Sequence, residues 1–377
     1  MKRVVLISYH VYASKRRAGF HGLADAYHAA GWDVTFVTVA LSRLSRLRGD
    51  YRLAFLGDHA ANRIEQVYPR LTSFIWYTPW HPANLRLGLL NALSRGLFSR
   101  YGELPMGEVE GRIRDANLII FESTPGILLF DRCKRLAPAA RFVYRVSDDL
   151  RYLKNHPLVI ETEDRVAPKF DLVSVPCEYI LRRFGHLPTA RLHYHGIRKP
   201  TFDTPCDSPF QKGCVNAVFV GNSFFDADFL ARAARLMPEW RFHIFGAIDD
   251  LPSADNIIPY GECAFAETVP YIVHADVGLQ NRLYRPGSES LTDSLKVIQY
   301  TYCRLPVVVP EFLRCGRTNF FYYKPGDDAS IRQALVDAKA MDRRTVARDG
   351  IQSWDELAAE LAGDTSASFS PGSLTRG

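Results

Sequence analysis

Lys296 and Gln299 stand three residues apart, on one face of a helix predicted within the stretch 285–311. The loop before this helix is rich in proline, glycine and serine. Ser290 is expected to cap the first turn, with Asp293 reaching back in the capping-box pattern. A lysine about one turn into such a helix suits a diphosphate, because the helix dipole, the free amides and the ammonium all favour anions. The competing interpretation is a capped helix whose lysine is ordinary surface structure.

Two consecutive carboxylates, Asp148 and Asp149, closely follow the predicted strand 141–145. They therefore stand at the carboxyl end of a predicted strand. One of them could act as a general base if a crevice raises its pKa toward neutrality. Ser147 and Asp148 would also serve well as a helix N-cap, and the local sequence favours that structural role.

A long polar loop follows the first predicted strand, at the edge where open α/β sheets place their ligands. It carries His10, Arg16 and Arg17. A lone histidine in such a loop is more often structural, whereas neighbouring arginines are as often ligand contacts as solvated charges. We take all three as candidates for ligand contact.

Two stretches in the first half of the chain, 41–52 and 85–101, combine leucines with basic residues. Their arginines are Arg43, Arg46 and Arg48 in the first stretch and Arg86, Arg95 and Arg100 in the second. Such segments can lie in anionic membrane interfaces, where each basic residue contributes roughly 1 kcal/mol. The alternative is that the leucines pack on their own domain. Two such stretches in one half favour the membrane interpretation.

Short apolar runs alternate with helical patterns along the whole chain, which predicts α/β domains with parallel sheets. In the first half, strands are predicted at 4–7, 33–37, 118–121, 141–145, 171–175 and 191–194. After a linker rich in proline and aspartate, the pattern restarts with predicted strands at 217–221, 242–246, 277–279 and 306–309. Each half therefore reads as one doubly wound, Rossmann-like domain.

The chain has 377 residues, more than one hydrophobic core usually supports, so we expect two domains. We place an N-terminal domain at 1–200 and a C-terminal domain at 201–345. A C-terminal helix within 346–362 is expected to return to the N-terminal domain. The last stretch, 363–377, is rich in serine, glycine and threonine, and we expect it to be disordered.

The composition excludes several classes of protein. A hydrophobic content of 47% and an aromatic content of 12% describe a packed globular protein. No apolar run reaches transmembrane length, and the N-terminus enters a predicted strand without a signal-peptide core, so we expect a cytoplasmic location. Seven scattered cysteines without a CxxC pair indicate neither disulfides nor zinc.

The uneven net charge of +6 points to an anionic surface or ligand. Nucleic acid is not supported as a partner, because we find no motif with interleaved basic and aromatic residues. Asp226 and Asp228 have the spacing of a metal-binding DxD. We interpret them as the start of a helix, because they follow a predicted strand and loop.

Several phrases, in this order, resemble GT-B glycosyltransferases and, more closely, glycosyltransferase family 70, the GumK-like glucuronosyltransferases. The phrases are SYHVYASKRRAGFH, LSRLSRLRGDYRL, FVYRVSDDL, AVFVGNSFFDADF, YGECAFAETVPYI and DSLKVIQYTYCRLPVV. The resemblance extends over residues 3–355. It implies a GT-B fold, in which two Rossmann-like doubly wound domains face each other across a cleft.

The resemblance also implies roles for individual residues. It makes Asp148 the general base, against the local preference for a cap. It makes Lys296 the ligand of the diphosphate and places Gln299 toward the ribose, where GT-B enzymes often carry glutamate. The other implied contacts to the nucleotide sugar are Gly221, Ser223, Glu262, Cys263, Arg282, Ser294 and Leu295.

Three of these positions depart from the family pattern. Ser223 and Cys263 stand where the relative carries methionines, so backbone groups would hold the base in place of thioethers. Arg282 stands where the relative carries a tyrosine. Its added cation leaves two interpretations open, a contact to a sugar carboxylate or a contact to the diphosphate.

The resemblance implies an inverting, metal-independent enzyme that needs no cofactor. It would move a sugar, with glucuronate as the implied donor, from a UDP-sugar to a lipid-diphosphate-linked oligosaccharide in bacterial exopolysaccharide assembly. The sequence agrees with inversion, because Val297 stands eight residues after Glu289, where retaining GT-B enzymes carry a second glutamate.

The expected location is peripheral, at the cytoplasmic face of the inner membrane, with the candidates of the first loop on the acceptor side. Two alternatives stay open. A UDP-sugar 2-epimerase would share the uridine site, and a non-catalytic membrane adaptor could retain the fold.

Overall fold

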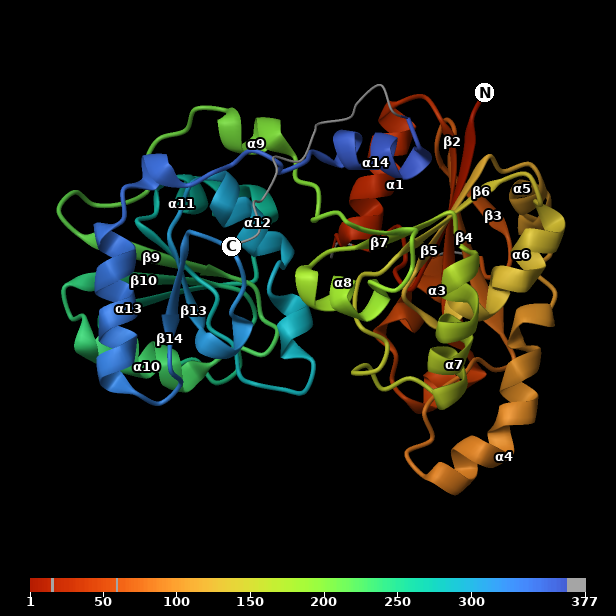
Figure 1. Cartoon of the computed structure of the whole chain (residues 1–377), viewed down its shortest axis with the longest axis horizontal. Coiled ribbons are helices and arrows are strands. Elements are labelled where there is room, and N and C mark those ends of the chain that lie inside the picture. The colour runs from red at the N-terminus through yellow and green to blue at the C-terminus, as the bar shows by residue number, and fades with distance from the viewer. Residues whose placement is uncertain (15–16, 59, 365–377) are drawn as a thin grey trace. The chain divides into compact units, whose positions relative to one another are not determined.

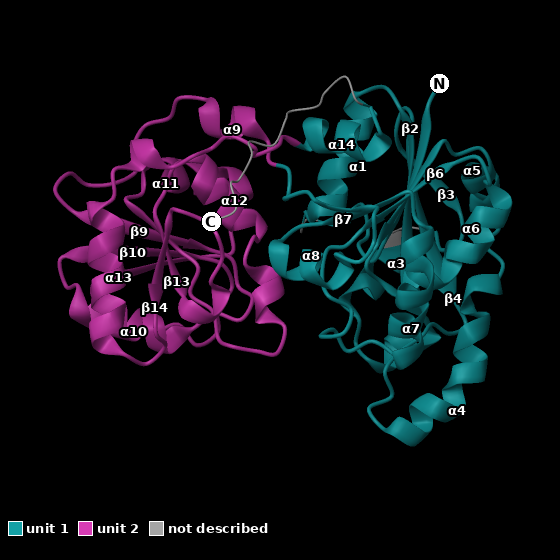
Figure 2. Ribbon diagram, in the orientation of Figure 1, with its two compact units in different colours: residues 1–196, 354–370 teal, residues 197–353, 371–377 magenta. Residues whose placement is uncertain are grey.

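The computed structural model describes residues 1–14, 17–58 and 60–364. They form two compact units, shown in separate colours in Figure 2. Unit 1 comprises Met1–Gly196 and the C-terminal segment that begins at Trp354, and unit 2 comprises Ile197–Ser353. Residues 346–353 thus belong to unit 2. The predicted disordered tail lies, from residue 365 onward, outside the described residues.

Unit 1 is built on an eight-stranded sheet with the strand order β3-β4-β2-β1-β5-β6-β7-β8. Neighbouring strands are parallel, except that β3 and β4 form an antiparallel pair at one edge. The strands are β1 (Arg3–Ser8), β2 (Asp33–Ser42), β3 (Ile64–Tyr68), β4 (Leu71–Thr78), β5 (Leu118–Glu122), β6 (Arg141–Arg145), β7 (Leu172–Val175) and β8 (Ala190–Leu192).

Helices cover both faces of this sheet, as Figure 1 shows. Alternate residues of β1 enter two different hydrophobic cores: Val5 and Ile7 one, Val4 and Leu6 the other. The apolar runs are therefore continuous because both faces of each strand are buried. The helices of unit 1 are α1 (Gly19–Ala29), α2 (Arg43–Leu47), α3 (Phe55–Asp58), α4 (Gly88–Phe98), α5 (Val109–Arg114), α6 (Phe130–Leu136), α7 (Pro157–Val166), α8 (Glu178–Phe184) and α14 (Trp354–Ala362).

Helix α14 packs beside α1, although more than 300 residues separate them in the chain (Figure 1). The Tyr27 hydroxyl donates to the Ala358 carbonyl at 2.8 Å. Gly22 lies directly under the Trp354 indole, where a Cβ would approach ring atoms to 2.5 Å. Glycine at this position therefore lets the two helices come together.

Unit 2 is built on a six-stranded, all-parallel sheet with the order β11-β10-β9-β12-β13-β14. Its strands are β9 (Val215–Val220), β10 (Trp240–Phe245), β11 (Ile257–Gly261), β12 (Val277–Leu279), β13 (Val307–Pro310) and β14 (Phe320–Tyr323). Its helices are α9 (Lys199–Asp203), α10 (Ala227–Leu236), α11 (Phe265–His274), α12 (Leu295–Tyr302) and α13 (Asp328–Ala340).

The predicted fold class, α/β with two doubly wound Rossmann-like domains, is confirmed. The prediction missed β3 and β4 in unit 1 and β11 and β14 in unit 2. Three of these, β3, β11 and β14, are edge strands, and β3 is largely exposed without a continuous apolar run. The prediction also started helix α12 too early, and the reason lies in the site that this helix helps to build.

Candidate functional site

Helix α12 begins at Leu295, with Ser294 as its N-cap, so Lys296 is the second helical residue. The predicted capping box of Ser290 and Asp293 does not form. The Ser290 hydroxyl donates to the Gly287 carbonyl at 2.7 Å, within a 3-10 turn before the helix. The lysine therefore lies at the first turn itself, where the free amides are.

The predicted cap fails because Asp293 has a partner elsewhere. It forms a buried ion pair with Arg317, which follows β13 in the chain. A charged hydrogen bond of this kind outweighs a contact to one cap amide. The helix accordingly begins at Leu295 and not at the predicted cap.

Lys296 is buried, with 9% of the residue exposed, and its ammonium lies 3.6 Å from the centroid of the Phe219 ring. A Cβ on Gly221, whose φ is +138°, would lie 3.6 Å from the same nitrogen. Burial, followed by the charge of Arg282, lowers the pKa of Lys296 well below 10.5. Within the part of the chain that the structure describes, no carboxylate lies within ion-pair distance of this ammonium.

A buried lysine next to an arginine is electrostatically unfavourable unless an anion neutralises it. Arg282, itself 7% exposed, donates to the Ser223 carbonyl at 3.1 Å. The structure thus brings Gly221, Ser223, Arg282 and Lys296 together at the carboxyl ends of β9 and β12. These are four of the nucleotide-site residues implied by the sequence.

Gln280 fixes the start of α12, and the sequence analysis missed it. This fully buried amide donates to the Ser294 hydroxyl at 3.1 Å and to the Leu291 carbonyl at 3.2 Å. Its position directly after the apolar residues of β12 was the available signal. Gln299 is buried one turn after Lys296, and Leu295 is partly exposed at the helix start.

Glu262 and Cys263 follow β11, two strands away from β9. The loops between them are joined by backbone contacts. The Gly221 amide donates to the Phe245 carbonyl at 2.9 Å, and the Gly246 amide donates to the Gly261 carbonyl at 2.7 Å. A Cβ on Gly246 would approach the Gly221 carbonyl oxygen to 2.0 Å, so this crossing requires glycine.

The carboxylates of the DxD spacing have structural partners. Asp226 caps α10, accepting from the Phe229 amide at 3.1 Å, and Asp228 pairs with Arg232 at 2.7 Å. The interpretation as a helix start is therefore confirmed.

In unit 1, Asp148 lies in the loop directly after β6. The Ser123 hydroxyl accepts hydrogen bonds from the amides of Ser147 and Asp148, both at 3.0 Å. These two bonds tie the loop of the candidate base to the end of the neighbouring strand β5. Asp148 is half-buried, and it caps no helix, because the next helix, α7, begins at Pro157.

A second carboxylate, Glu122, lies beneath this loop, and the sequence analysis missed it. It is 5% exposed and accepts from the Ser8 hydroxyl at 2.6 Å, the Tyr9 amide at 3.0 Å and the Ser147 hydroxyl at 3.0 Å. The His10 Nε2 atom lies 3.6 Å from the Oε1 atom of Glu122. Glu122 directly follows a four-residue apolar run, which was the signal for a carboxylate at a strand end.

Asp149, the second carboxylate of this loop, has two arginine partners. Its buried carboxylate pairs with Arg151 at 2.5 Å and Arg183 at 3.0 Å. Burial raises the pKa of Asp149, but the hydrogen bonds from Arg151 and the charge of Arg183 outweigh it and hold the pKa below 3.8. Asp149 is therefore an anchor of the loop that carries Asp148.

Of the two first-loop candidates that the structure describes, His10 lies in this network and Arg17 does not. Arg17 pairs with Asp25 at 2.6 Å and lies over the Tyr12 ring, which is a structural role on helix α1. Arg16 lies outside the described residues.

The leucines of α4 face solvent, so the alternative that they pack on their own domain is wrong for the stretch 85–101. In the stretch 41–52 that alternative holds for Leu41, which is fully buried, whereas Leu47 is 85% exposed. Helix α4 lies at the edge of unit 1 in Figure 1. Leu89 and Leu93 are each 72% exposed, and the further exposed leucines of this segment are Leu87, Leu90 and Leu97. The inner side of the helix combines the buried Phe98 ring, which packs edge-on against His156, with polar groups, since the carbonyl of Asn91 and the hydroxyl of Ser94 bond the same His156 ring.

The basic residues near these leucines are exposed as well. They are Arg43, Arg46, Arg48, Arg86 and Arg95. Arg48 donates to the Asn84 carbonyl at 2.6 Å, which links the first basic stretch to the loop before α4, and Arg95 pairs with Glu161. Among the described residues, no helix is long and apolar enough to cross a membrane.

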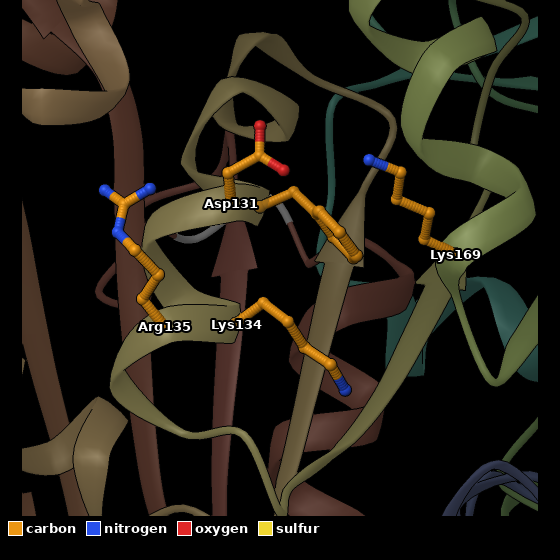
Figure 3. A pocket seen from close by; sticks show the side chains of 5 residues that line it. Asp131, Lys134, Arg135 and Lys169 are labelled. Atoms are coloured by element: carbon orange, nitrogen blue, oxygen red, sulfur yellow. The ribbon is translucent and has the colours of Figure 1, made fainter.

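A separate pocket of about 520 Å³ lies beside α6 and the segment before β7 (Figure 3). It is lined by Phe130, Asp131, Lys134, Arg135 and Lys169. Arg165 neutralises Asp131, and Glu103 neutralises Arg135. This pocket is lined by none of the candidate site residues.

Comparisons with known proteins agree with this geometry. Residues 6–176 match the family model of the N-terminal domain of the glucuronosyltransferase GumK. A UDP-glucuronate:glycolipid 2-beta-glucuronosyltransferase from Xanthomonas campestris pv. campestris is 30% identical over 337 residues, which cover 89% of this chain and 83% of that protein.

Solved structures share the fold at low sequence identity. The Anabaena protein HepE, in complex with UDP and glucose, matches with a TM-score of 0.57 and 12% identity, over 97% of both chains. The sucrose-phosphate synthase of Thermosynechococcus elongatus matches with a TM-score of 0.55 and 15% identity, over 96% of this chain and 94% of that one.

Proposed function

Because this chain belongs to the family of GumK-like glucuronosyltransferases, we propose that it transfers glucuronate from UDP-glucuronate to a glycolipid. One observation carries the donor half of this proposal. The ammonium of Lys296 is buried beside Arg282, with no carboxylate to neutralise it among the described residues. A diphosphate supplies the missing negative charge.

The proposed donor site uses two cations and a helix start. Lys296 and Arg282 neutralise the diphosphate, and the free amides at the start of α12 add the partial positive charge of the helix dipole. Charge also develops on the leaving UDP in the transition state, so the same groups lower the barrier. Two side-chain cations in this position supply what a metal ion supplies elsewhere, which supports a metal-independent reaction.

The proposed base is Asp148. It would take the proton of the acceptor hydroxyl while that oxygen attacks the anomeric carbon and the bond to UDP breaks. A single displacement inverts the anomeric configuration. Support comes from the contacts that hold the loop of Asp148 in place. The Ser123 hydroxyl accepts from two amides of the loop, and the neighbouring Asp149 forms a buried ion pair with Arg183.

The acceptor of the proposed reaction is a lipid-diphosphate-linked oligosaccharide, held at the cytoplasmic face of the inner membrane during exopolysaccharide assembly. The exposed leucines of α4 support peripheral attachment, because an outward apolar helix face gains free energy in a membrane interface. The exposed arginines nearby add attraction to anionic lipid.

The test is a transfer assay with a panel of UDP-sugars, an acceptor lipid and excess EDTA. We expect transfer from UDP-glucuronate that EDTA leaves intact, with an inverted anomeric centre in the product. Formation of an epimerised UDP-sugar without acceptor would indicate the 2-epimerase alternative. Loss of transfer in EDTA would contradict the metal-independent mechanism, and absence of UDP binding would indicate an adaptor.

A further inference from the structure

Phe224 combines two unfavourable features. Its backbone is left-handed, with φ at +53°, and its side chain is 48% exposed. Six non-glycine residues among those described have positive φ, and Phe224 is the only aromatic one. A bulky residue in this conformation is strained, and glycine or asparagine would relieve the strain. The aromatic residue of this turn that packs into the core is the adjacent Phe225, which contacts Phe219. The exposed Phe224 ring does not make that contact.

The strained residue is held in place from both sides. Its carbonyl accepts from the Leu283 amide at 2.8 Å, and the preceding Ser223 carbonyl accepts from Arg282 at 3.1 Å. Phe225 and Arg282 form an antiparallel bridge between the same two segments. The backbone of Phe224 is therefore fixed beside Arg282, one of the two cations of the donor site.

Two further exposed apolar side chains adjoin this position. Leu283 is 42% exposed and Tyr284 is 58% exposed. Leu283 is hydrogen-bonded to the backbone of Phe224, and Tyr284 follows it and packs edge-on against Phe312. These three exposed apolar residues define a patch that is joined to Arg282 along the chain. Apolar patches rimmed by polar residues mark ligand sites, and strained residues cluster there.

The strand order says which part of the ligand this patch faces. The neighbouring strands of the sheet lie in the order β11-β10-β9-β12. The loop of Glu262 follows β11, whereas the patch joins the loops that follow β9 and β12. Gly221 directly follows β9, between these two positions, and the Lys296 ammonium lies against it, 3.6 Å from where a Gly221 Cβ would be. A nucleotide sugar whose diphosphate occupies the middle has its nucleoside on one side and its sugar on the other.

We propose that Phe224 is the platform on which the pyranose ring of the nucleotide sugar stacks. This inference rests on the proposed function. The C–H groups on one face of a pyranose are weakly positive and pack against the negative face of an aromatic ring. Leu283 and Tyr284 extend that face, and strain at Phe224 is retained because it aims the ring at the sugar.

The test compares the binding of UDP-glucuronate and UDP by calorimetry, without acceptor, and records thermal melts. For Phe224→Gly we expect UDP-glucuronate affinity to fall about 3- to 10-fold and UDP affinity to change less than about 2-fold. The variant should melt at or above the wild-type temperature, because glycine removes the strain. Phe224→Tyr keeps the ring face and should keep both affinities.

Arg304→Gly is the matched control, since Arg304 has a φ of +58° but lies at the far end of α12. It should relieve strain without changing either affinity. Unchanged UDP-glucuronate affinity in Phe224→Gly, or an equal loss for UDP, would overturn the inference while leaving the proposed function standing. A wild-type protein that binds neither ligand would overturn both.

Discussion

Charged side chains at the two candidate sites are held in opposite ways. Asp149 is fully paired with two arginines, whereas Lys296 is buried next to another cation. A paired buried charge stabilises a loop, and an uncompensated one stores free energy that a ligand releases. The first arrangement suits a support and the second suits a binding site.

Replacing Asp148 separates catalysis from support. Asp148→Asn removes basicity without changing shape, so turnover should fall by about 10²- to 10⁴-fold while UDP affinity stays near wild type. Asp149→Asn is the control, because it breaks buried ion pairs and should lose roughly 3 kcal/mol of stability but little rate in the folded protein. Transfer assays and thermal melts measure both. Equal activity of Asp148→Asn and wild type would exclude it as the base.

Replacing Lys296 tests the diphosphate site and its protonation. Lys296→Met keeps the stem and removes the charge, so UDP binding should weaken by about 1.5 to 3 kcal/mol. The UDP-free protein should be no less stable, because a desolvated charge is removed. An unchanged UDP dissociation constant would remove Lys296 from the site.

The lowered pKa of Lys296 also predicts a pH dependence. A bound diphosphate raises this pKa again, so between the two values the complex holds one more proton than the free protein. UDP binding should take up protons and weaken as pH rises through that window. Calorimetry at alkaline pH in buffers of different ionisation enthalpy measures the uptake, and identical uptake in Lys296→Met would contradict the assignment.

At the scale of elements, α4 reverses the usual orientation of an amphipathic helix. Apart from Phe98 at its C-terminal end, the helix turns the polar residues Asn91 and Ser94 toward the domain, and its leucines face solvent. A helix in a soluble domain normally buries its apolar stripe. The reversed orientation is favourable only where the outer face meets an apolar environment.

The exposed leucines should therefore affect membrane binding and not folding. Leu89→Ser with Leu93→Ser should reduce co-sedimentation with anionic vesicles and leave the melting temperature unchanged, because both side chains are already exposed. Glutamine at Arg43, Arg46 and Arg48 should reduce the dependence on anionic lipid and salt. Val336→Ser is the control, because Val336 is an exposed apolar residue of another helix, α13. Unchanged vesicle binding by the leucine variant would contradict peripheral attachment through α4.

At the scale of the whole molecule, the chain leaves unit 1 after Gly196 and returns to it at Trp354. The return depends on close packing of α14 against α1, and Gly22 makes room for the indole. The completeness of unit 1 thus depends on residues from both ends of the chain.

Gly22→Ala should destabilise the protein by about 1 to 3 kcal/mol, because the new methyl group overlaps the Trp354 ring. Gly111→Ala is the matched control. Gly111 is also helical, but no atom lies within 4 Å of its added Cβ, so alanine should stabilise by about 0.5 to 1 kcal/mol. Thermal melts measure both, and limited proteolysis detects release of α14. Equal shifts in the two variants would show that α14 does not depend on this contact.

The sequence by itself determined what depends on local pattern. Continuous apolar runs predicted the buried strands, the restart of that pattern predicted two domains, and Lys296 stood out by its place in a helix after a flexible loop. The tertiary structure decided what depends on distant partners. Asp293 pairs with Arg317 and does not cap α12, so the helix begins later than predicted. Glu122 bonds Ser8 and Ser147, which lie more than 20 residues before and after it in the chain. Solvent exposure of the α4 leucines was likewise undetermined, because a helical period shows that an apolar face exists but not what covers it.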